Sequence, residues 1–156
     1  MIDHRRAGIA GLAVSASAFV AIVMHEGYSD TAIIPVPGDV PTIGFGTTGG
    51  VKPGDHITPP RAVARALADM QKFEGAIKQC VKAPLAQYEY DAAVSLSYNI
   101  GGAAFCRSSV VSKWNAGDYA GGCEAILLYD KFKGKPLKGL TVRRQAEYRQ
   151  CKGDSP

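Results

Sequence analysis

The sequence predicts an α+β domain that is mostly helical, with one small β region near residues 28–50. From residue 59 onward, apolar residues recur at spacings of three and four, which is typical of amphipathic helices. Between residues 26 and 50, prolines and glycines interrupt that pattern and favour loops and short strands. The length of 156 residues suits one domain with a sizeable core.

Residues 7–24 form an uncharged apolar segment, AGIAGLAVSASAFVAIVM, that follows Arg5 and Arg6. As a helix, these 18 residues would span about 27 Å, close to the hydrocarbon thickness of a bilayer. The two arginines would keep the N-terminus in the cytoplasm and direct the rest outward. Ten of the 18 residues are Ala, Gly or Ser, so we expect lipid to hold the segment only weakly.

Four interpretations of residues 7–24 fit this composition. The segment could be a cleaved signal peptide, a permanent anchor or a buried core helix. It could also be a helix that is hydrophobic enough to enter the membrane and too weak to stay there. The fourth interpretation becomes the favoured one only with the motif that follows the segment.

The expected elements follow in chain order. The run VPTIGFG, residues 40–46, is compatible with a strand that enters a turn. Thr58 is a good N-cap and Pro59 suits the first helical position, so a helix should run from there to about Val81. A second helix should cover residues 85–100 and stop at Gly101 and Gly102. Further helices are predicted over residues 107–115, 119–130 and 141–151.

The four cysteines are Cys80, Cys106, Cys123 and Cys151. None forms a C-x-x-C pair and no histidine lies at zinc-finger spacing, so the sequence predicts no metal site. An even number in an exported protein indicates two disulfides, with three possible pairings. We favour Cys106–Cys123 and Cys80–Cys151, the first as a staple across the turn between two helices.

Positive charge is concentrated near the C-terminus. The net charge is +4, and residues 131–152 hold eight Lys or Arg against one acidic residue, Glu147. This run is either a solvated helix face or a surface for an acidic polymer such as nucleic acid or cell wall.

A candidate catalytic group follows the apolar segment directly. Hydrolysis of a glycosidic bond commonly needs one carboxylic acid to protonate the leaving oxygen and one carboxylate to activate water or attack carbon. Glu26, beside apolar residues, is the candidate acid, and Asp30 and Asp39 are candidates for the second carboxylate. Thr42 and Thr47 carry hydroxyls that could hold a water. Taken alone, such residues also occur by chance in many loops.

Four ordered blocks make the pattern specific: EGY with VPTIGFGTT, LAQYEYDAAVSLSYNIGGAAF, NAGDY, and LKGLTVRRQAEYRQC. Over residues 26–151 the chain resembles the phage lysozyme family, glycoside hydrolase family 24. The resemblance implies a lysozyme-like fold with a weakly hydrophobic N-terminal helix. That helix is similar to the signal-arrest-release segment of some endolysins in this family, which favours a helix that enters the membrane and later leaves it.

The resemblance assigns roles to residues. Glu26 matches the family's general acid, and Thr42 matches the threonine that positions water. The family usually has Asp or Cys nine residues after the Glu, but that position is Pro35 here, and Thr42 comes one residue late. Asp39 is the nearest replacement for the missing Asp and Asp30 the second choice. Either could instead be a turn residue that bonds nearby backbone N–H groups.

The resulting expectation is a monomeric phage endolysin that cleaves the β-1,4 bond between N-acetylmuramic acid and N-acetylglucosamine in peptidoglycan. Residues 1–24 would be the signal-arrest-release segment and residues 25–156 the catalytic domain. The chain would lie in the host inner membrane, with its N-terminus in the cytoplasm and its catalytic domain in the periplasm, and then be released to the periplasm. No cofactor, metal or nucleic acid is expected. The alternatives are a lytic transglycosylase and a non-catalytic, membrane-tethered wall-binding protein.

Overall fold

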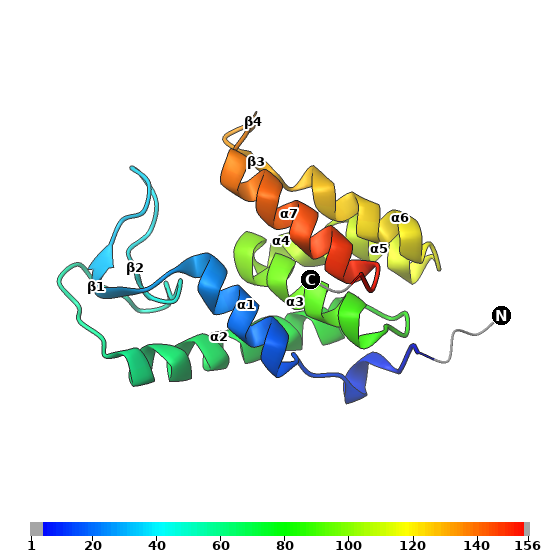
Figure 1. Ribbon diagram of the computed structural model, residues 1–156, viewed down its shortest axis with the longest axis horizontal. Helices are drawn as coiled ribbons and strands as arrows, with labels where there is room; N and C mark the ends of the chain where they lie inside the picture. The colour runs from blue at the N-terminus through cyan, green and yellow to red at the C-terminus, as the bar shows by residue number, and fades with distance from the viewer. Residues whose placement is uncertain (1–4, 155–156) are drawn as a thin grey trace. The chain divides into compact units, whose positions relative to one another are not determined.

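The computed structural model describes residues 5–154, and helices account for most of these residues (Figure 1). The chain divides into two compact units. The first consists of Met1–Ala18 and Phe73–Pro156, and the second consists of Phe19–Lys72. The predicted α+β class, mostly helical with a small β region near residues 28–50, is confirmed.

The second unit carries the small sheet. Helix α1 (Ala16–Glu26) ends where Gly27 adopts a φ of 69°, a conformation that glycine reaches at no steric cost. Strand β1 (Ser29–Ile33) then pairs antiparallel with β2 (Thr42–Gly44). In this pairing Ser29 lies opposite Gly44 and Ile33 lies opposite Thr42, with an irregularity between them.

Helix α2 (Pro59–Cys80) begins at the predicted residue and ends within one residue of the predicted end. The N–H of Ala62 donates to the carbonyl of Thr58 at 2.9 Å, which is the first helical bond. Ala62, Ala66 and Met70 recur at a spacing of four and are fully buried, as the apolar pattern requires.

The first unit is built around α3 (Gln87–Ile100), whose residues from Glu89 to Ser97 are all buried. Helix α3 packs against α4 (Gly102–Cys106) and α7 (Lys138–Cys151), and α5 (Ser109–Asn115) packs against α6 (Tyr119–Ala125). The largest fully buried apolar side chains of this unit include Trp114, Tyr90, Phe105, Leu96 and Ile126. Helices surround α3, which explains why its sequence is apolar on more than one face.

Several short elements after α3 were not predicted. Helix α3 ends before Gly101, as predicted, but a further helix, α4, begins directly after this glycine. The predicted helix over residues 119–130 is α6 followed by the 3-10 helix η2 (Ile126–Leu128). A short hairpin follows, β3 (Lys131–Phe132) with β4 (Lys135–Pro136), turned by Lys133 and Gly134 at φ of 49° and 79°.

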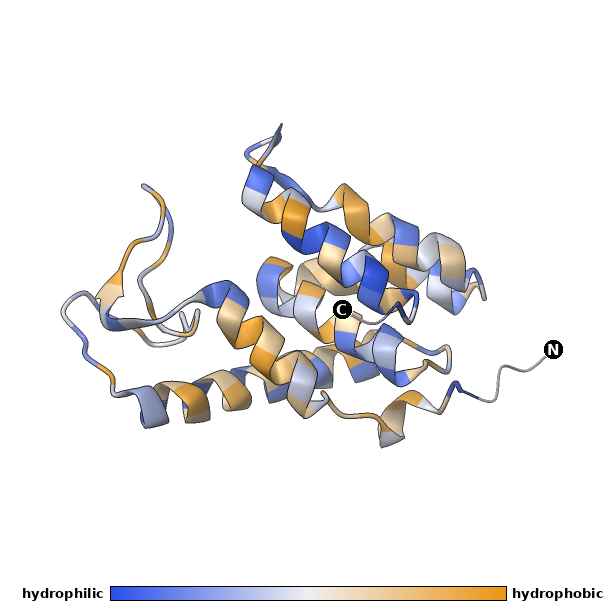
Figure 2. Ribbon diagram, in the orientation of Figure 1, coloured by the Kyte–Doolittle hydropathy of each residue, from blue (hydrophilic) through white to orange (hydrophobic). Residues whose placement is uncertain are grey.

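The apolar segment, residues 7–24, is not one helix in this structure. It contains the 3-10 helix η1 (Ile9–Gly11), then residues without regular secondary structure, and becomes α-helical only at Ala16. Apolar residues colour the middle of α1 in Figure 2. Ile22 is buried, whereas Met24 is 77% exposed. Among residues 5–154, no helix is both long and apolar enough to cross a membrane.

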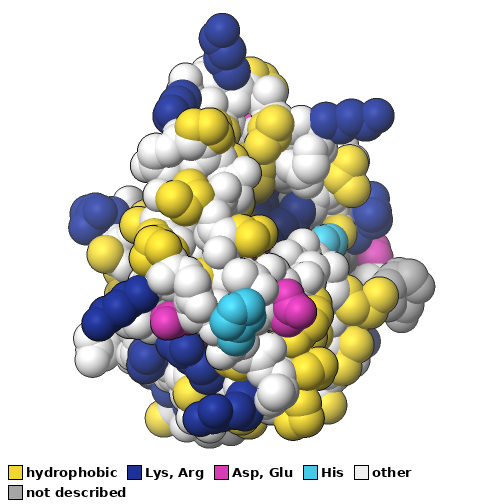
Figure 3. Space-filling model, turned by 90° about the vertical axis from the view of Figure 1, so that its left-hand side faces the viewer, with side chains coloured by type: hydrophobic (Ala, Val, Ile, Leu, Met, Phe, Trp, Pro, Cys, Tyr) yellow, Lys and Arg dark blue, Asp and Glu magenta, His cyan; other side chains and the backbone are white. Residues whose placement is uncertain are grey.

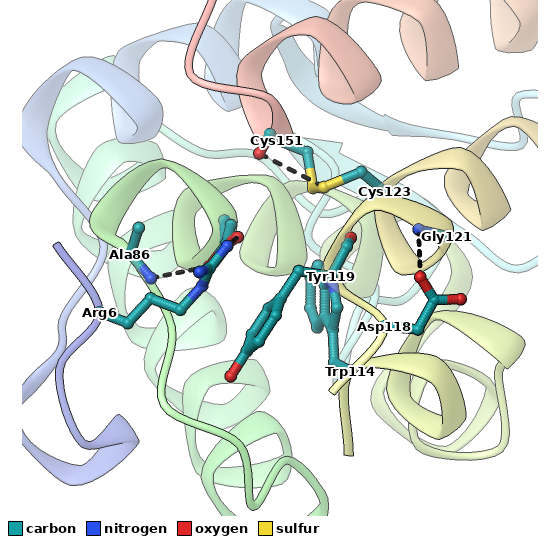
Figure 4. Close-up of polar contacts among 9 residues, drawn as sticks. Arg6, Ala86, Trp114, Asp118, Tyr119, Gly121, Cys123 and Cys151 are labelled. Atoms are coloured by element: carbon teal, nitrogen blue, oxygen red, sulfur yellow. Dashed lines mark hydrogen bonds and ion pairs between the residues drawn. A yellow bond between two sulfur atoms is a disulfide. The ribbon is translucent and has the colours of Figure 1, made fainter. Parts of the chain in front are cut away.

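The predicted disulfide pairing was wrong, although the prediction of two disulfides is confirmed. The bonds are Cys80–Cys106 and Cys123–Cys151 (the second is drawn in Figure 4). Helix α4 explains the difference, because it brings residue 106 back to the end of α2. A Cβ placed on Gly102 would lie 3.0 Å from the Ala76 Cβ, and this close approach puts Cys106 beside Cys80.

Most of the basic run is exposed, but part of it is internal. Arg143 and Arg144 are buried on α7 and pair with Glu147, at 3.2 Å from Arg143 Nε to Oε1 and 2.7 Å from Arg144 Nε to Oε2. The Ser95 hydroxyl donates to the same carboxylate at 2.6 Å. The exposed remainder of the run is Lys131, Lys133, Lys135, Lys138, Arg149 and Lys152.

Candidate active site

Glu26 ends α1 and points its carboxylate at the turn that follows β2. The side chain is half-buried. A Cβ built on Gly46 would lie only 2.9 Å from Glu26 Oε2 and 3.2 Å from its Cδ. Gly46 also has a φ of 82°, so both its backbone conformation and its closeness to Glu26 require glycine. Glu26 is thus held against bare backbone within the second unit.

The turn itself is closed by a pair of backbone hydrogen bonds. The N–H of Ile43 donates to the Thr47 carbonyl at 2.9 Å, and the N–H of Thr47 donates to the Ile43 carbonyl at 3.1 Å. Gly44 and Gly46 provide the positive φ values that such a short loop needs. The sequence identified the turn, but gave no sign that it would lie against Glu26.

Thr47 does not offer its hydroxyl to water as the sequence suggested. The residue is only 2% exposed, and its Oγ1 donates to Oδ2 of Asp69 on α2 at 2.7 Å. The sequence alone does not mark Asp69, because an aspartate is typical of the polar face of an amphipathic helix. The hydroxyl of Thr47 is therefore a structural contact.

Thr42 begins β2 and is half-buried. Its hydroxyl donates to the carbonyl of Val40 at 3.2 Å. The residue lies opposite Ile33 across the sheet, and it precedes Gly46 by four positions on the same strand and turn. A hydroxyl with a single weak donor bond can also accept a hydrogen bond from water.

Asp39 and Asp30, the two candidates for the second carboxylate, are both exposed. Oδ1 of Asp39 accepts a hydrogen bond from the N–H of Val40 at 2.8 Å. The backbone N–H of Asp39 donates to the Val36 carbonyl at 3.0 Å. Oδ1 of Asp30 accepts from the hydroxyl of Thr31 at 3.0 Å. Asp39 thus has the contacts of a turn residue, whereas the carboxylate of Asp30 is bonded to the next residue of the strand, Thr31.

An aromatic pair adjoins the site. The rings of Tyr28 and Phe45 lie 5.3 Å apart, and the hydroxyl of Tyr28 donates to the Ile57 carbonyl at 2.9 Å. Several apolar side chains at the end of β1 and in the loop that follows it are also exposed: Ile33, Ile34, Val36 and Val40. Figure 3, which faces the β1–β2 end, shows hydrophobic side chains among acidic and histidine side chains. Such a surface suits a ligand with both apolar and polar faces.

The chemistry of this site is that of carboxyl and hydroxyl groups. It can donate a proton from Glu26 and hold a water through Thr42 or a nearby aspartate. Within residues 5–154, no group of three or more His, Cys, Asp or Glu side chains is arranged to hold a metal ion.

Comparison with known proteins gives a consistent result. The sequence model of the phage lysozyme family matches residues 23–147. The SAR-endolysin of Pseudomonas phage phiKMV is 38% identical over 144 residues, which cover 89% of this chain and 88% of the relative. The endolysin of Salmonella phage P22 is 39% identical over 113 residues, 69% of this chain and 77% of the relative.

A solved structure agrees in fold. The endolysin from Escherichia coli O157:H7 phage FAHEc1 superposes with a TM-score of 0.78 at 35% identity, covering 90% of this chain and 94% of that one. The lysozyme-like fold expected from the four sequence blocks is thereby confirmed. Because the family match spans most of the chain, with Glu26 and Thr42 inside it, the chain belongs to the phage lysozyme family.

Proposed function

We propose that this chain is a phage endolysin in which Glu26 is the general acid and Thr42 and Asp39 position the attacking water. As a member of the phage lysozyme family it is a glycoside hydrolase that degrades peptidoglycan and so causes host lysis. The scissile bond is the β-1,4 bond between N-acetylmuramic acid and N-acetylglucosamine. The observation that carries the assignment is the half-buried Glu26 carboxylate, held against the Gly46 turn that directly follows Thr42.

The proposed reaction uses each group once. Glu26 gives its proton to the glycosidic oxygen as the bond from that oxygen to the sugar carbon breaks. Water then forms the new bond to that carbon, and one proton of this water passes to the carboxylate of Asp39. Thr42 accepts a hydrogen bond from this water and fixes its direction of approach.

Asp39 is the proposed second carboxylate. Its Oδ1 already accepts from the N–H of Val40. The other carboxylate oxygen would order the water, and the exposed place of Asp39 in the β1–β2 loop leaves room for it. Asp30 is the weaker choice, because it lies on β1 with its carboxylate bonded to the neighbouring Thr31.

The turn contacts of Asp39 also favour one second candidate, lytic transglycosylation. That reaction needs an acid such as Glu26 but no carboxylate that activates water, because a hydroxyl of the sugar itself attacks. The two reactions leave different ends on the wall fragments: hydrolysis leaves reducing ends and transglycosylation leaves anhydro-sugars.

Three variants and one product analysis test the proposal. Glu26→Gln should abolish wall degradation while the melting temperature stays near that of the wild type. Asp39→Asn should cost much more activity than Asp30→Asn. Full activity of Asp39→Asn would show that Asp39 takes no part in the mechanism. Anhydro-sugars among the released muropeptides would show that the enzyme catalyses transglycosylation and not hydrolysis. A non-catalytic wall-binding protein would keep its wall effects in Glu26→Gln.

Residues 7–24 are proposed to lie transiently in the host inner membrane. Their lack of charge, their flanking arginines and their low hydrophobicity support entry followed by release. A relative 38% identical bears the name SAR-endolysin. The N-terminus would then lie in the cytoplasm and the catalytic domain in the periplasm, where the released chain acts as a monomer.

Buried carboxylates provide a place for the released segment. Oε1 of Glu74 accepts from the N–H of Val14 at 2.8 Å. The carboxylate of Asp91 accepts from the N–H of Ser15 at 2.9 Å and from its hydroxyl at 2.7 Å. While the segment spans the membrane, Val14 and Ser15 cannot form these hydrogen bonds, and Glu26 is held at the lipid surface. The exported enzyme would therefore be inactive until the segment leaves the membrane.

The exposed part of the basic run would meet the wall. Six exposed Lys and Arg between residues 131 and 152 face no acidic residue within that run, since Glu147 is occupied by buried Arg143 and Arg144. Attraction of these charges to an anionic wall polymer is screened by salt, so wall binding should weaken as ionic strength rises. No nucleic-acid partner is proposed.

A further inference from the structure

Two residues of α2 hold the turn that follows β2. The hydroxyl of Thr47 donates to Oδ2 of Asp69 at 2.7 Å, and Nη2 of Arg65 donates to the carbonyl of Gly49 at 2.7 Å. Arg65 and Asp69 are four residues apart and therefore lie on the same face of the helix. Thr47 is almost fully buried, so its bond to a carboxylate is shielded from competing water.

The same turn forms the wall behind the Glu26 carboxylate. Gly46 lies so close to this carboxylate that a Cβ on it would come within 2.9 Å of Oε2. Gly46 is bonded in sequence to Thr47, the residue tied to Asp69. A small movement of the Thr47 backbone would therefore move the wall against which Glu26 rests.

We propose that Thr47 and Asp69 are positioning residues, whose hydrogen bond keeps the Gly46 backbone against Glu26 and so fixes the direction in which the acid presents its proton. This inference rests on the proposed role of Glu26 as the acid. The two residues act through the turn and not by contact with the substrate. A misplacement of about 1 Å at a reacting group can lower a rate by two orders of magnitude, so the effect on turnover should be measurable.

The surroundings of Asp69 make the pair suitable for a clean substitution. Oδ1 of Asp69 is 3.3 Å from the ammonium nitrogen of Lys72, an exposed residue one turn further along α2. Removal of the Thr47 hydroxyl therefore leaves Asp69 with a charged partner and with access to water. Thr47→Val keeps the branched shape of the side chain, so it deletes the hydrogen bond without opening a cavity.

The experiment compares Thr47→Val with Thr47→Ser, which keeps the hydroxyl, and with Ser108→Ala as a stability control. Ser108 is 3% exposed and caps α5 through a bond from the N–H of Val111, so its loss destabilises the fold in the first unit. Turnover and KM are measured on soluble peptidoglycan fragments, with the melting temperature of each variant. We expect Thr47→Val to lose about tenfold or more in kcat with KM within about twofold. Thr47→Ser should restore most of this loss, and Ser108→Ala should keep wild-type kcat despite a lower melting temperature.

A second readout does not depend on activity. In the wild type, the amide resonance of Gly46 should shift as Glu26 ionises, because the two groups are in contact, and this response should disappear in Glu26→Gln. In Thr47→Val the response should be much smaller, and in Thr47→Ser it should return. Either a wild-type kcat or a wild-type Gly46 response in Thr47→Val overturns the inference. A loss of kcat in Ser108→Ala as large as that in Thr47→Val overturns it as well.

Failure of the proposed function has a different signature. If Glu26→Gln remains active, Glu26 is not the acid, whatever the Gly46 resonance does. If Glu26→Gln is inactive while Thr47→Val is fully active, only the positioning role is wrong.

Discussion

Arg6 and Glu89 are 83 positions apart in the sequence and form a doubly hydrogen-bonded ion pair. Nε of Arg6 donates to Oε2 at 3.1 Å and Nη2 donates to Oε1 at 2.6 Å, where Glu89 is 2% exposed. The guanidinium also lies 3.6 Å from the centroid of the Tyr119 ring, beside which Figure 4 shows it. Arg6, which is expected from the sequence to keep the N-terminus in the cytoplasm, thus also has a buried partner in the folded structure.

Arg6→Lys separates these two roles. Lysine keeps the positive charge that directs membrane orientation, but it lacks the planar fork that pairs with a carboxylate and stacks on an aromatic ring. We expect the folded protein to lose roughly 1–3 kcal/mol of unfolding free energy, measured by urea titration. The control is Arg149→Lys, an exposed position on α7 that should change little. Equal stability of Arg6→Lys and the wild type would show that the pair is dispensable.

The buried cluster on α7 should be among the most sensitive sites for stability. Glu147→Gln would leave Arg143 and Arg144 buried beside a neutral group, which typically costs about 3 kcal/mol or more. The midpoint of urea unfolding should fall accordingly. Arg149→Gln on the same helix provides a matched exposed control. An unchanged midpoint in Glu147→Gln would mean that water reaches and solvates the two arginines.

Acid should weaken the cap of α6. Asp118 accepts a bond from the Gly121 N–H (Figure 4) and lies 3.1 Å from the Lys113 ammonium, and these contacts, in that order, lower the pKa of its carboxyl. A lowered pKa means that the stabilisation is present above the ordinary aspartate pKa and is lost as pH falls through the lower folded value. We expect Asp118→Asn to melt below the wild type at pH 7.

The difference in melting temperature between the wild type and Asp118→Asn should depend on pH. As the pH is lowered from 7 toward 2, a growing share of the wild-type carboxyl is protonated and resembles Asn, so the difference between the two melting temperatures should shrink. Asp154→Asn, at the exposed end of the chain, should show a smaller effect at both pH values. A difference that stays constant from pH 7 to pH 2 would rule out the charge of Asp118 as its cause.

Greater hydrophobicity of the N-terminal segment should trap the protein in the membrane. Gly8 and Gly11 have nothing within 4 Å of an added Cβ, so larger side chains fit the released structure at both positions. Replacing them and Ala10 by Leu should favour the inserted state, since each Leu promotes insertion. Membrane fractionation should then find the variant with the membrane pellet, and lysis should be blocked. A variant that remains in the periplasm and lyses normally would contradict the proposal.

Deletion of residues 1–24 behind a cleavable secretion signal tests the folded role of the segment. The deletion removes most of α1 and the partners of Glu74 and Asp91. We expect a large loss of both stability and activity. If the truncated protein is stable and fully active, the segment serves only as an address.

Local signals were sufficient for the long helices. Thr58 and Pro59 marked the start of α2, and Gly101, with a φ of 90°, marked the end of α3. In both cases the deciding chemistry lies within a few residues of the helix end, which is why the sequence could reveal it. The Cys80–Cys106 disulfide, in contrast, depends on α4, a helix of five residues that approaches α2 closely at Gly102. The Cys123–Cys151 disulfide depends on the packing of α6 against α7. Neither packing arrangement has a local signal in the sequence.

In the candidate site, too, local features could be predicted from the sequence and contacts between distant residues could not. Glu26 and Thr42 could be selected from the sequence because their motifs are short and ordered. The contact of Glu26 with Gly46 could not, because it joins residues 20 positions apart through the exact course of a turn. Asp69 was missed for a similar reason, since only the fold brings a polar residue of α2 to the buried hydroxyl of Thr47.

The placement of the disulfides has a consequence for control by oxidation. The first cysteine in the chain is Cys80, so the unit that holds Glu26, residues 19–72, contains no thiol. Both bonds lie within the other unit and each closes a loop of 26 or 28 positions, worth about 3.5 kcal/mol by the chain-entropy estimate. A reducing environment would therefore loosen the scaffold but could not cap or uncap the acid through thiol exchange. Under the proposed release of residues 7–24 from the membrane, the redox state of the periplasm would affect how long the enzyme survives and not when its acid becomes available.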